Sequence, residues 1–174
     1  ELGGFDVLDW LTQLLARNDL DKPDGRTLFR YRATDEEYRE LLDLLSQSDP
    51  LARKKSLVLD RLFVLFASEW WRRNYSGGAW AWRSITDPLG WPVLSHKQLS
   101  SLVASGLRYW QRPLLTYQDM SNAFLLSIVL EGGLPVNILE TAGNNLTRYL
   151  KALLDDFSTY RGSGIATEKL AEDI

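Results

Sequence analysis

The chain has 174 residues, of which 45% are hydrophobic and 25% charged, and this composition is typical of one globular domain with its own core. Because it has no cysteine, disulfide bonds and thiolate chemistry are excluded, and a reducing cytosol fits. The longest apolar stretch, residues 62–67, is far shorter than the roughly 20 residues of a membrane span, and residues 1–20 lack the pattern of a signal peptide. We therefore expect a cytoplasmic protein that has no membrane partner.

The net charge of −3 is divided unevenly along the chain. Residues 1–48 hold six basic and eleven acidic residues, residues 49–115 hold ten basic and four acidic ones, and residues 116–174 hold four basic and eight acidic ones. The positive middle can attract nucleic acid. It can equally pair with the acidic ends of its own chain or of a partner. We favour the intramolecular or solvated interpretation, because charged faces are usually hydrated.

The first part of the chain predicts two helices with a turn between them. Residues 5–18 place apolar side chains on one helical face, and a proline–aspartate–glycine turn follows at residues 23–25. Residues 28–31 are expected to form a short extended segment that packs on the helices, without a partner strand. Thr34 and Glu37 have the spacing of a capping box, which opens the second helix.

The longest predicted helix is the centre of the expected fold and contains residues 57–74. Asp49 and Pro50 are expected to begin it, as the cap and the first helical residue. The glycines at 77–78 are expected to end it, because glycine fits the left-handed conformation of a helix C-cap. Apolar residues cover nearly the whole circumference of this helix, so other helices should surround it.

The second half of the chain predicts only helices and turns. Ser95 and Gln98 form a second capping box. The expected helices lie at residues 79–86, 95–110, 117–131, 135–139 and 144–157. We therefore expect an all-α fold, an irregular multi-helix bundle of about six to eight helices around a long buried central helix.

Residues 1–161 are predicted to form this helical domain. Residues 162–174 contain a Gly-Ser-Gly linker and then what resembles the beginning of a following segment. The chain begins with Glu1 instead of methionine and stops inside a helix-like stretch. We expect it to be a piece of a larger protein or a processed chain.

Residues with catalytic chemistry are scarce in this sequence. His96 is the only histidine and follows a helix cap, so we expect it to be exposed. Without cysteine, a zinc site would need mostly carboxylates. Neither a nucleophile elbow nor a phosphate-binding loop is present. Adjacent acids such as Glu36 and Glu37 point about 100° apart on a helix and do not face each other. We therefore expect no enzyme activity, no metal and no cofactor, although the fold can still bring distant carboxylates together.

One stretch combines aromatic and basic residues in a way that suggests binding. Five of the seven tryptophans lie between Trp70 and Trp91, interleaved with arginines. Aromatic rings alternating with arginine are typical of surfaces that bind single-stranded nucleic acid. Core packing is the alternative that we favour, because buried tryptophans dominate cores and arginines stabilise the C-terminus of a helix. The candidate nucleic-acid-binding residues in the basic segment 53–112 are Lys54, Lys55, Arg72, Arg73, Arg83, Arg108 and Arg112.

Three stretches resemble a known family. They read PDGRTLFRYRATDEEY, LFVLFASEWWRRNYSGGAWAW and EGGLPVNILETAGNNLTRYLKALL. Together they resemble the N-terminal region of large bacterial proteins of the YjiT-like family, over roughly residues 10–160. The EWWRRNYSGGAWAW segment is the most specific part of the resemblance.

Proteins of that family lie beside a helicase in anti-phage defence islands of the Druantia type. The resemblance therefore implies a role in defence against phage, together with a helicase-like partner. It carries no catalytic motif in this region. We accordingly expect a non-catalytic module that scaffolds or recruits a protein partner. The alternative is a module that binds nucleic acid, such as DNA, through the basic aromatic segment.

Overall fold

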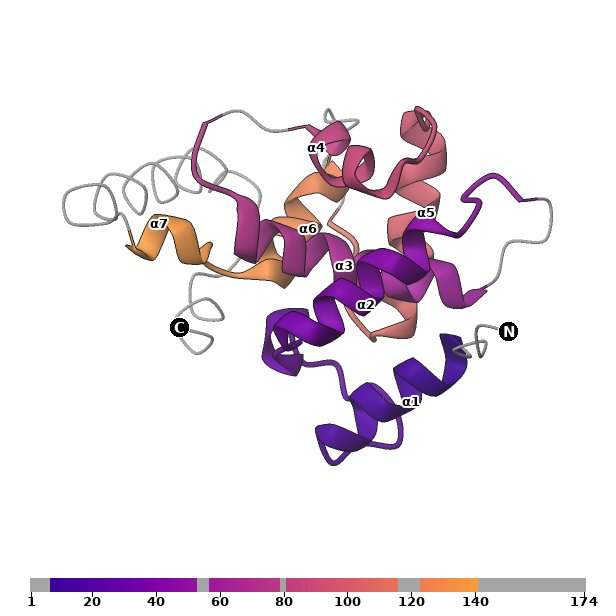
Figure 1. Ribbon diagram of the computed structural model, residues 1–174, viewed down its shortest axis with the longest axis vertical. Coiled ribbons are helices and arrows are strands. Elements are labelled where there is room, and N and C mark those ends of the chain that lie inside the picture. The colour runs from indigo at the N-terminus through magenta and orange to yellow at the C-terminus, as the bar shows by residue number, and fades with distance from the viewer. Residues whose placement is uncertain (1–6, 53–56, 79–80, 116–122, 141–174) are drawn as a thin grey trace.

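The computed structural model describes residues 7–52, 57–78, 81–115 and 123–140 (Figure 1). Within these ranges the chain forms α-helices and 3-10 helices and no β-strand, which confirms the all-α fold class. None of the helices in these ranges is long and apolar enough to cross a membrane. In chain order the elements are α1 (Val7–Arg17), η1 (Leu28–Tyr31), α2 (Asp35–Ser46), α3 (Leu57–Asn74), α4 (Trp82–Thr86), η2 (Asp87–Leu89), α5 (His96–Tyr109), α6 (Ala123–Gly132) and α7 (Val136–Glu140).

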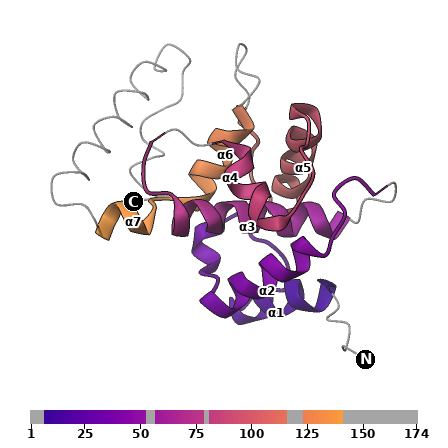
Figure 2. The ribbon, with the colours of Figure 1, turned by 45° about the horizontal axis from the view of Figure 1, so that its top comes forward.

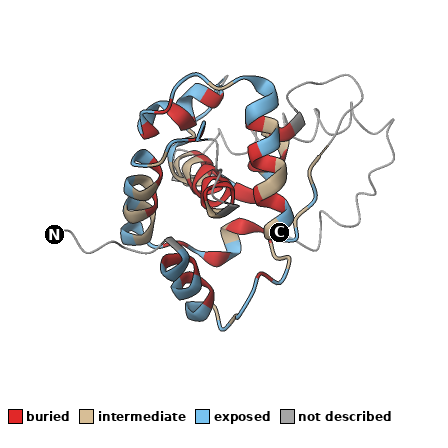
Figure 3. Cartoon of the chain, turned by 90° about the vertical axis from the view of Figure 1, so that its right-hand side faces the viewer, coloured by how far each residue is buried: buried red, intermediate tan, exposed pale blue. Residues whose placement is uncertain are grey.

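The centre of the fold is α3, as its apolar circumference predicts. All six residues from Leu62 to Ala67 are at most 1% exposed, although they point in every direction around the helix. Contacts with α1, α2, η1, α5, α6 and α7 account for this burial. Figure 2 shows α3 running between α2 on one side and α5 and α6 on the other, and in Figure 3 its buried turns occupy the middle of the molecule.

Two glycines let helices pack closely on α3. A Cβ atom on Gly106 of α5 would collide with the carbonyl oxygen of Asp60 and a methyl group of Val64. A Cβ atom on Gly132 of α6 would lie 2.6 Å from both the Ser68 carbonyl oxygen and Trp71 Cδ1. Because no real Cβ atom tolerates such distances, the spacing between α3 and these two helices depends on glycine.

Both predicted capping boxes are confirmed. At the start of α2, the Glu37 amide donates to Thr34 Oγ1 at 3.2 Å, and the Thr34 amide donates to Glu37 Oε2 at 2.7 Å. At the start of α5, the Gln98 amide donates to Ser95 Oγ at 3.3 Å, and the Ser95 amide donates to Gln98 Oε1 at 2.8 Å. These side chains satisfy amide groups that have no partner within the helix.

The structure corrects the prediction of an extended segment at residues 28–31. These residues form the 3-10 helix η1, and both Leu28 and Tyr31 are fully buried against the core. The turn is held from a distant part of the chain, because the Leu28 amide donates to the buried carboxylate of Glu131 at 3.0 Å. It ends at Arg32, which has a left-handed backbone conformation.

A second correction concerns the start of α3. Asp49 and Pro50 do not begin that helix, because residues 49–52 are not helical and the helix is described from Leu57. Asp49 instead closes a turn of its own, since its side chain accepts the Leu51 amide at 2.8 Å and its carbonyl accepts the Ala52 amide at 3.3 Å. An aspartate that accepts the amide two residues ahead favours such a turn over helix initiation.

Later elements agree with the prediction where the structure describes them. The short helix expected at residues 79–86 is α4, and η2 follows it directly. The helix predicted from residue 117 is described only from Ala123, and Gly133, with φ at +66°, follows its last residue. The helix predicted at residues 144–157 and the boundary after residue 161 lie outside the described residues.

Candidate functional site

The aromatic part of the predicted binding segment lies mostly in the core. Trp71, Trp82 and Trp91 are each at most 7% exposed. The rings of Trp82 and Trp91 stack against the central Phe63, with centroids 5.9 and 5.0 Å from its ring. Their burial supports the core-packing interpretation for these three tryptophans. Trp80 lies outside the described residues.

Two of these indoles also hold the backbone of neighbouring segments. Trp71 Nε1 donates to the carbonyl oxygen of Gly133 at 2.9 Å. Trp91 Nε1 donates to the carbonyl oxygen of Leu45 at 2.9 Å. A buried indole N–H needs such an acceptor. The hydrogen bonds therefore fix the end of α6 to α3 and the segment after η2 to α2.

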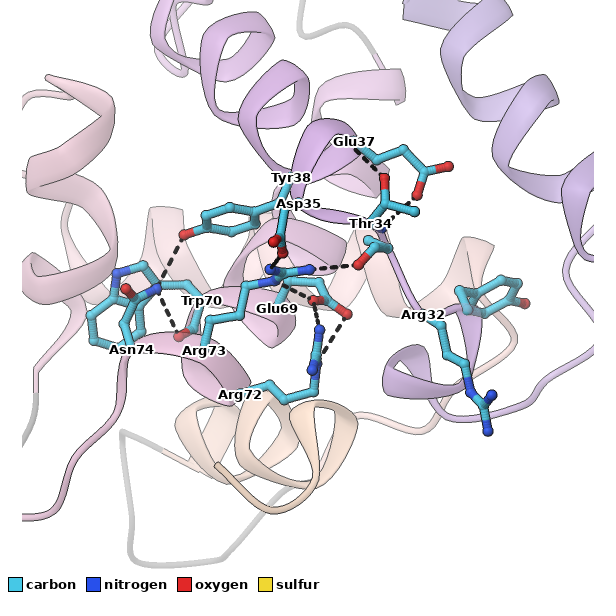
Figure 4. A network of polar contacts seen from close by, with 12 residues as sticks. Arg32, Thr34, Asp35, Glu37, Tyr38, Glu69, Trp70, Arg72, Arg73 and Asn74 are labelled. Carbon is cyan, nitrogen blue, oxygen red and sulfur yellow. Dashed lines mark hydrogen bonds and ion pairs between the residues drawn. The ribbon is translucent and has the colours of Figure 1, made fainter. Parts of the chain in front are cut away.

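The basic part of the segment is partly used inside the fold. Arg72 and Arg73, in the last turn of α3, both point to the carboxylate of Glu69 on the same helix (Figure 4). Arg72 Nη2 lies 2.5 Å from Glu69 Oε2, and Arg73 Nε lies 2.9 Å from the same oxygen. The Glu69 side chain is only 1% exposed. Two guanidinium groups thus neutralise one buried acid.

Arg73 also connects α3 to the start of α2. Its guanidinium makes an ion pair with Asp35, donates to the carbonyl oxygen of Ala33 at 2.5 Å and lies 4.9 Å from the centre of the Tyr38 ring (Figure 4). The hydrogen bond from Arg73 lowers the pKa of the Asp35 carboxyl. One arginine therefore links α2, α3 and the segment before α2.

Arg112 makes a similar connection after α5. Its Nε lies 2.8 Å from Glu131 Oε1 on α6, and its Nη1 donates to the carbonyl oxygen of Gly25 at 2.7 Å. The pairs Arg73–Asp35 and Arg112–Glu131 join the basic middle of the chain to its acidic first and last parts. For these two arginines, the geometry matches the intramolecular interpretation of the charge pattern.

The remaining candidate residues have different surroundings. The Arg83 side chain on α4 is 71% exposed, and its Nε lies 3.9 Å from Asp87 Oδ1. Arg108 on α5 is exposed. Lys54 and Lys55 lie outside the described residues. Among the described candidates, the structure therefore leaves Arg83 and Arg108 exposed to solvent, whereas Arg72, Arg73 and Arg112 bind acids of the fold.

Sequence reasoning missed the two buried acids that organise the arginines. Glu69 and Glu131 are 1% and 2% exposed, and neither was a candidate residue. A signal for each was present, because each is a lone acid in an apolar helical run. Glu69 also has arginines three and four residues ahead, the spacing at which side chains meet on a helix.

The described residues hold no cluster of side chains that could bind a metal ion. In those ranges, no group of three or more His, Asp or Glu side chains is placed to hold a metal ion. His96 is exposed, as predicted, and its ring contacts Phe124 edge-on with centroids 6.2 Å apart. Arg72 and Arg73 bind Glu69, and Arg112 and the Leu28 amide bind Glu131, which suits these two acids to holding the fold.

Comparison with known proteins identifies the family. The family model of the YjiT N-terminal domain matches residues 4–134. Protein YjiT of Escherichia coli (strain K12) is 31% identical over 171 residues, which is 95% of this chain and 32% of that protein. The chain thus spans about a third of the length of this relative. No solved structure matches. The match over most of the chain shows that it belongs to the YjiT N-terminal domain family.

Proposed function

We propose that the chain is a non-catalytic helical module of a bacterial anti-phage defence protein, and that it scaffolds or recruits a helicase-like partner. The defence context and the partner rest on the resemblance described above. The cytoplasmic location of the module stays a prediction from the sequence.

The non-catalytic part of the proposal is supported by the burial of Glu69 and Glu131 and by the arginines that bind them. General acid–base catalysis needs a carboxyl group that can reach a substrate and exchange a proton with it. The side chains of Glu69 and Glu131 are 1% and 3% exposed, and arginine guanidinium groups bind both. Their arrangement favours a rigid support over a reactive centre.

The size of the relative supports a modular role. The chain corresponds to about a third of Protein YjiT, so the matched domain is one part of a longer polypeptide in that relative. A compact helical domain whose buried charges are paired within the fold presents a stable outer surface to other domains or proteins. We expect the outward faces of the helices around α3 to make these contacts.

The test is a pull-down with tagged full-length protein, which measures recovery of the helicase-like protein proposed to be encoded beside it. Tagged full-length protein should retain this partner, and the same protein without residues 1–161 should lose it. Equal recovery by both forms would overturn the proposal. A full-length Glu131→Gln variant, which weakens the fold of the module, should reduce recovery.

A module that binds nucleic acid is the second candidate function. The specific observation in its favour is that Arg83 and Arg108 are directed to solvent, in a part of the chain that is poor in acids. Arg72, Arg73 and Arg112 are less suited to phosphate contacts because they already bind acids of the fold. Binding that weakens steeply with salt would support this candidate.

A further inference from the structure

One helix of the fold has an outer face with basic and small residues and no acid. The exposed or half-exposed residues of α5 include Lys97, Ser101, Ala104, Ser105 and Arg108. At 100° per residue, these five fall within an arc of about 100° on one side of the helix. The opposite side is buried and consists of Leu99, Leu102, Val103, Gly106 and Leu107.

The charge of this face is not neutralised within the described residues. The sequence has no aspartate or glutamate from residue 88 to residue 118. Neither Lys97 nor Arg108 makes an ion pair in the part of the chain that the structure describes. Next to this face, the Arg61 guanidinium of α3 lies 4.0 Å from the centre of the Tyr109 ring on α5. The five residues of the face themselves carry only positive charge, although the whole chain has a net negative charge.

The spacing of the two charges allows each to contact a different phosphate, because the charges of duplex DNA follow one another every 1.7 Å along its axis. Lys97 and Arg108 are eleven residues apart, which corresponds to about 16 Å along the helix axis. The major groove of B-form DNA is about 12 Å wide and admits an α-helix. The small side chains of Ser101, Ala104 and Ser105 between the two bases let a ligand approach the helix closely. Figures 1 and 2 show α5 at the edge of the molecule, with α3 on its inner side.

We propose that the outer face of α5 binds the phosphate backbone of duplex DNA. Lys97 and Arg108 contact phosphates at the two ends of the helix, and the hydroxyl groups of Ser101 and Ser105 donate to phosphate oxygens between them. Such contacts position a protein on DNA without reading its sequence. This inference rests on the second candidate function, nucleic-acid binding, and assigns a site to it.

The structure favours duplex DNA over other nucleic acids. Single-strand binding uses exposed aromatic rings on which bases stack, whereas Trp71, Trp82 and Trp91 are buried in this fold. The deep, narrow major groove of an RNA duplex does not admit an α-helix, whereas the wider major groove of B-form DNA does. The five residues of the α5 face offer charged and hydroxyl groups for backbone contacts and no aromatic ring for base stacking.

The experiment measures fluorescence anisotropy of a labelled DNA duplex at several salt concentrations. The test variant is Lys97→Gln/Arg108→Gln. The matched control is Lys22→Gln/Arg32→Gln, which removes the same charge from exposed positions near α1 and η1. Urea unfolding of each variant confirms that its stability equals that of the wild type.

The wild type should bind the duplex more tightly than the corresponding single strand. The test variant should bind about tenfold more weakly at low salt, and the slope of log K against log salt should fall by about 2, since each lost phosphate contact removes about 0.9. The control should match the wild type. If the test variant and the control bind equally, the α5 site is overturned while nucleic-acid binding stands. If the wild type shows no duplex binding at low salt, or prefers the single strand, both the site and its ligand class are overturned.

Discussion

The carboxylate of Glu131 binds Arg112 with one oxygen and the backbone amide of Leu28 with the other, at 2.8 and 3.0 Å. Leu28 is separated from Glu131 by 103 positions in the sequence. A single buried side chain on α6 therefore holds η1 and the segment after α5 in place. Its removal would leave the Nε–H of Arg112 and the buried N–H of Leu28 without their acceptor.

The first prediction concerns this carboxylate. Glu131→Gln should lower the free energy of unfolding by about 3 kcal/mol, because breaking a buried ion pair leaves the other charge uncompensated. Urea unfolding monitored by tryptophan fluorescence measures the change. Asp43→Asn removes the same charge from an exposed position of α2 and should change stability by less than about 0.5 kcal/mol. Equal effects of the two substitutions would contradict the role assigned to Glu131.

A second prediction tests the close packing on α3. Gly106→Ala and Gly132→Ala should each destabilise the fold by about 1–3 kcal/mol, although alanine is the better helix former. The reason is steric, since each new methyl group would overlap the α3 backbone. Ser101→Ala at an exposed position of α5 is the control and should be neutral or slightly stabilising. A stabilising effect of both glycine substitutions would show that the helices can separate without cost.

The central helix and its two capped neighbours were predictable because their signals are local. The apolar circumference of α3 and the box of Thr34 and Glu37 depend on residues within a few turns of one another. By contrast, η1 was predicted as an extended segment, because its conformation depends on Glu131, which is 103 positions away. The turn at Asp49 was missed because the same residue type caps helices and closes turns.

In the candidate site too, local sequence signals were predictable and contacts between distant positions were not. The sequence identified the arginines but not their partners, since Asp35 lies 38 positions from Arg73 and no local rule joins them. Only the pair of Glu69 with Arg72 and Arg73 has a local spacing, three and four residues along one helix. Charge totals over long segments favoured an intramolecular or solvated role for the basic middle, without naming the residues.

The third prediction compares how much the two acids bound by Arg73, Glu69 and Asp35, contribute to stability. Arg73→Gln should lower the free energy of unfolding by about 2 kcal/mol, because Glu69 is buried and loses a charged donor. Asp35→Asn should have a smaller effect, since the Asp35 side chain is 83% exposed and surface ion pairs contribute little. Both are measured by urea unfolding at neutral pH. A larger loss from Asp35→Asn would contradict this ranking.

The pH dependence of the Asp35 contact has a defined sign. The hydrogen bond from Arg73 lowers the pKa of Asp35 from its ordinary 3.8. Its contribution to stability is therefore present above pH 3.8 and is lost as the pH falls through the lower value of the folded state. Wild type and Asp35→Asn should accordingly converge in stability in strong acid. A difference that stays constant below pH 3 would show that the ion pair is not its source.

The fourth prediction concerns stability in alkali. Tyr31 is fully buried, with its ring edge-on to Trp110 at a centroid distance of 4.8 Å. Burial raises the pKa of Tyr31 from 10.0 to about 12. Since the unfolded chain releases this proton more readily, the contribution of Tyr31 to stability is complete below pH 10 and is lost as the pH rises to about 12.

Tyr31→Phe should therefore flatten the decline in stability between pH 10 and 12. One proton of difference changes the free energy of unfolding by about 1.4 kcal/mol per pH unit, so the wild type should fall more steeply by up to this amount. Unfolding curves at pH 7 supply the reference for both proteins. Tyr38, Tyr75 and Tyr109 contribute to the remaining decline of the variant, because burial raises their pKa as well. Parallel declines of wild type and variant would mean that the Tyr31 hydroxyl ionises in the folded protein as easily as in the unfolded chain.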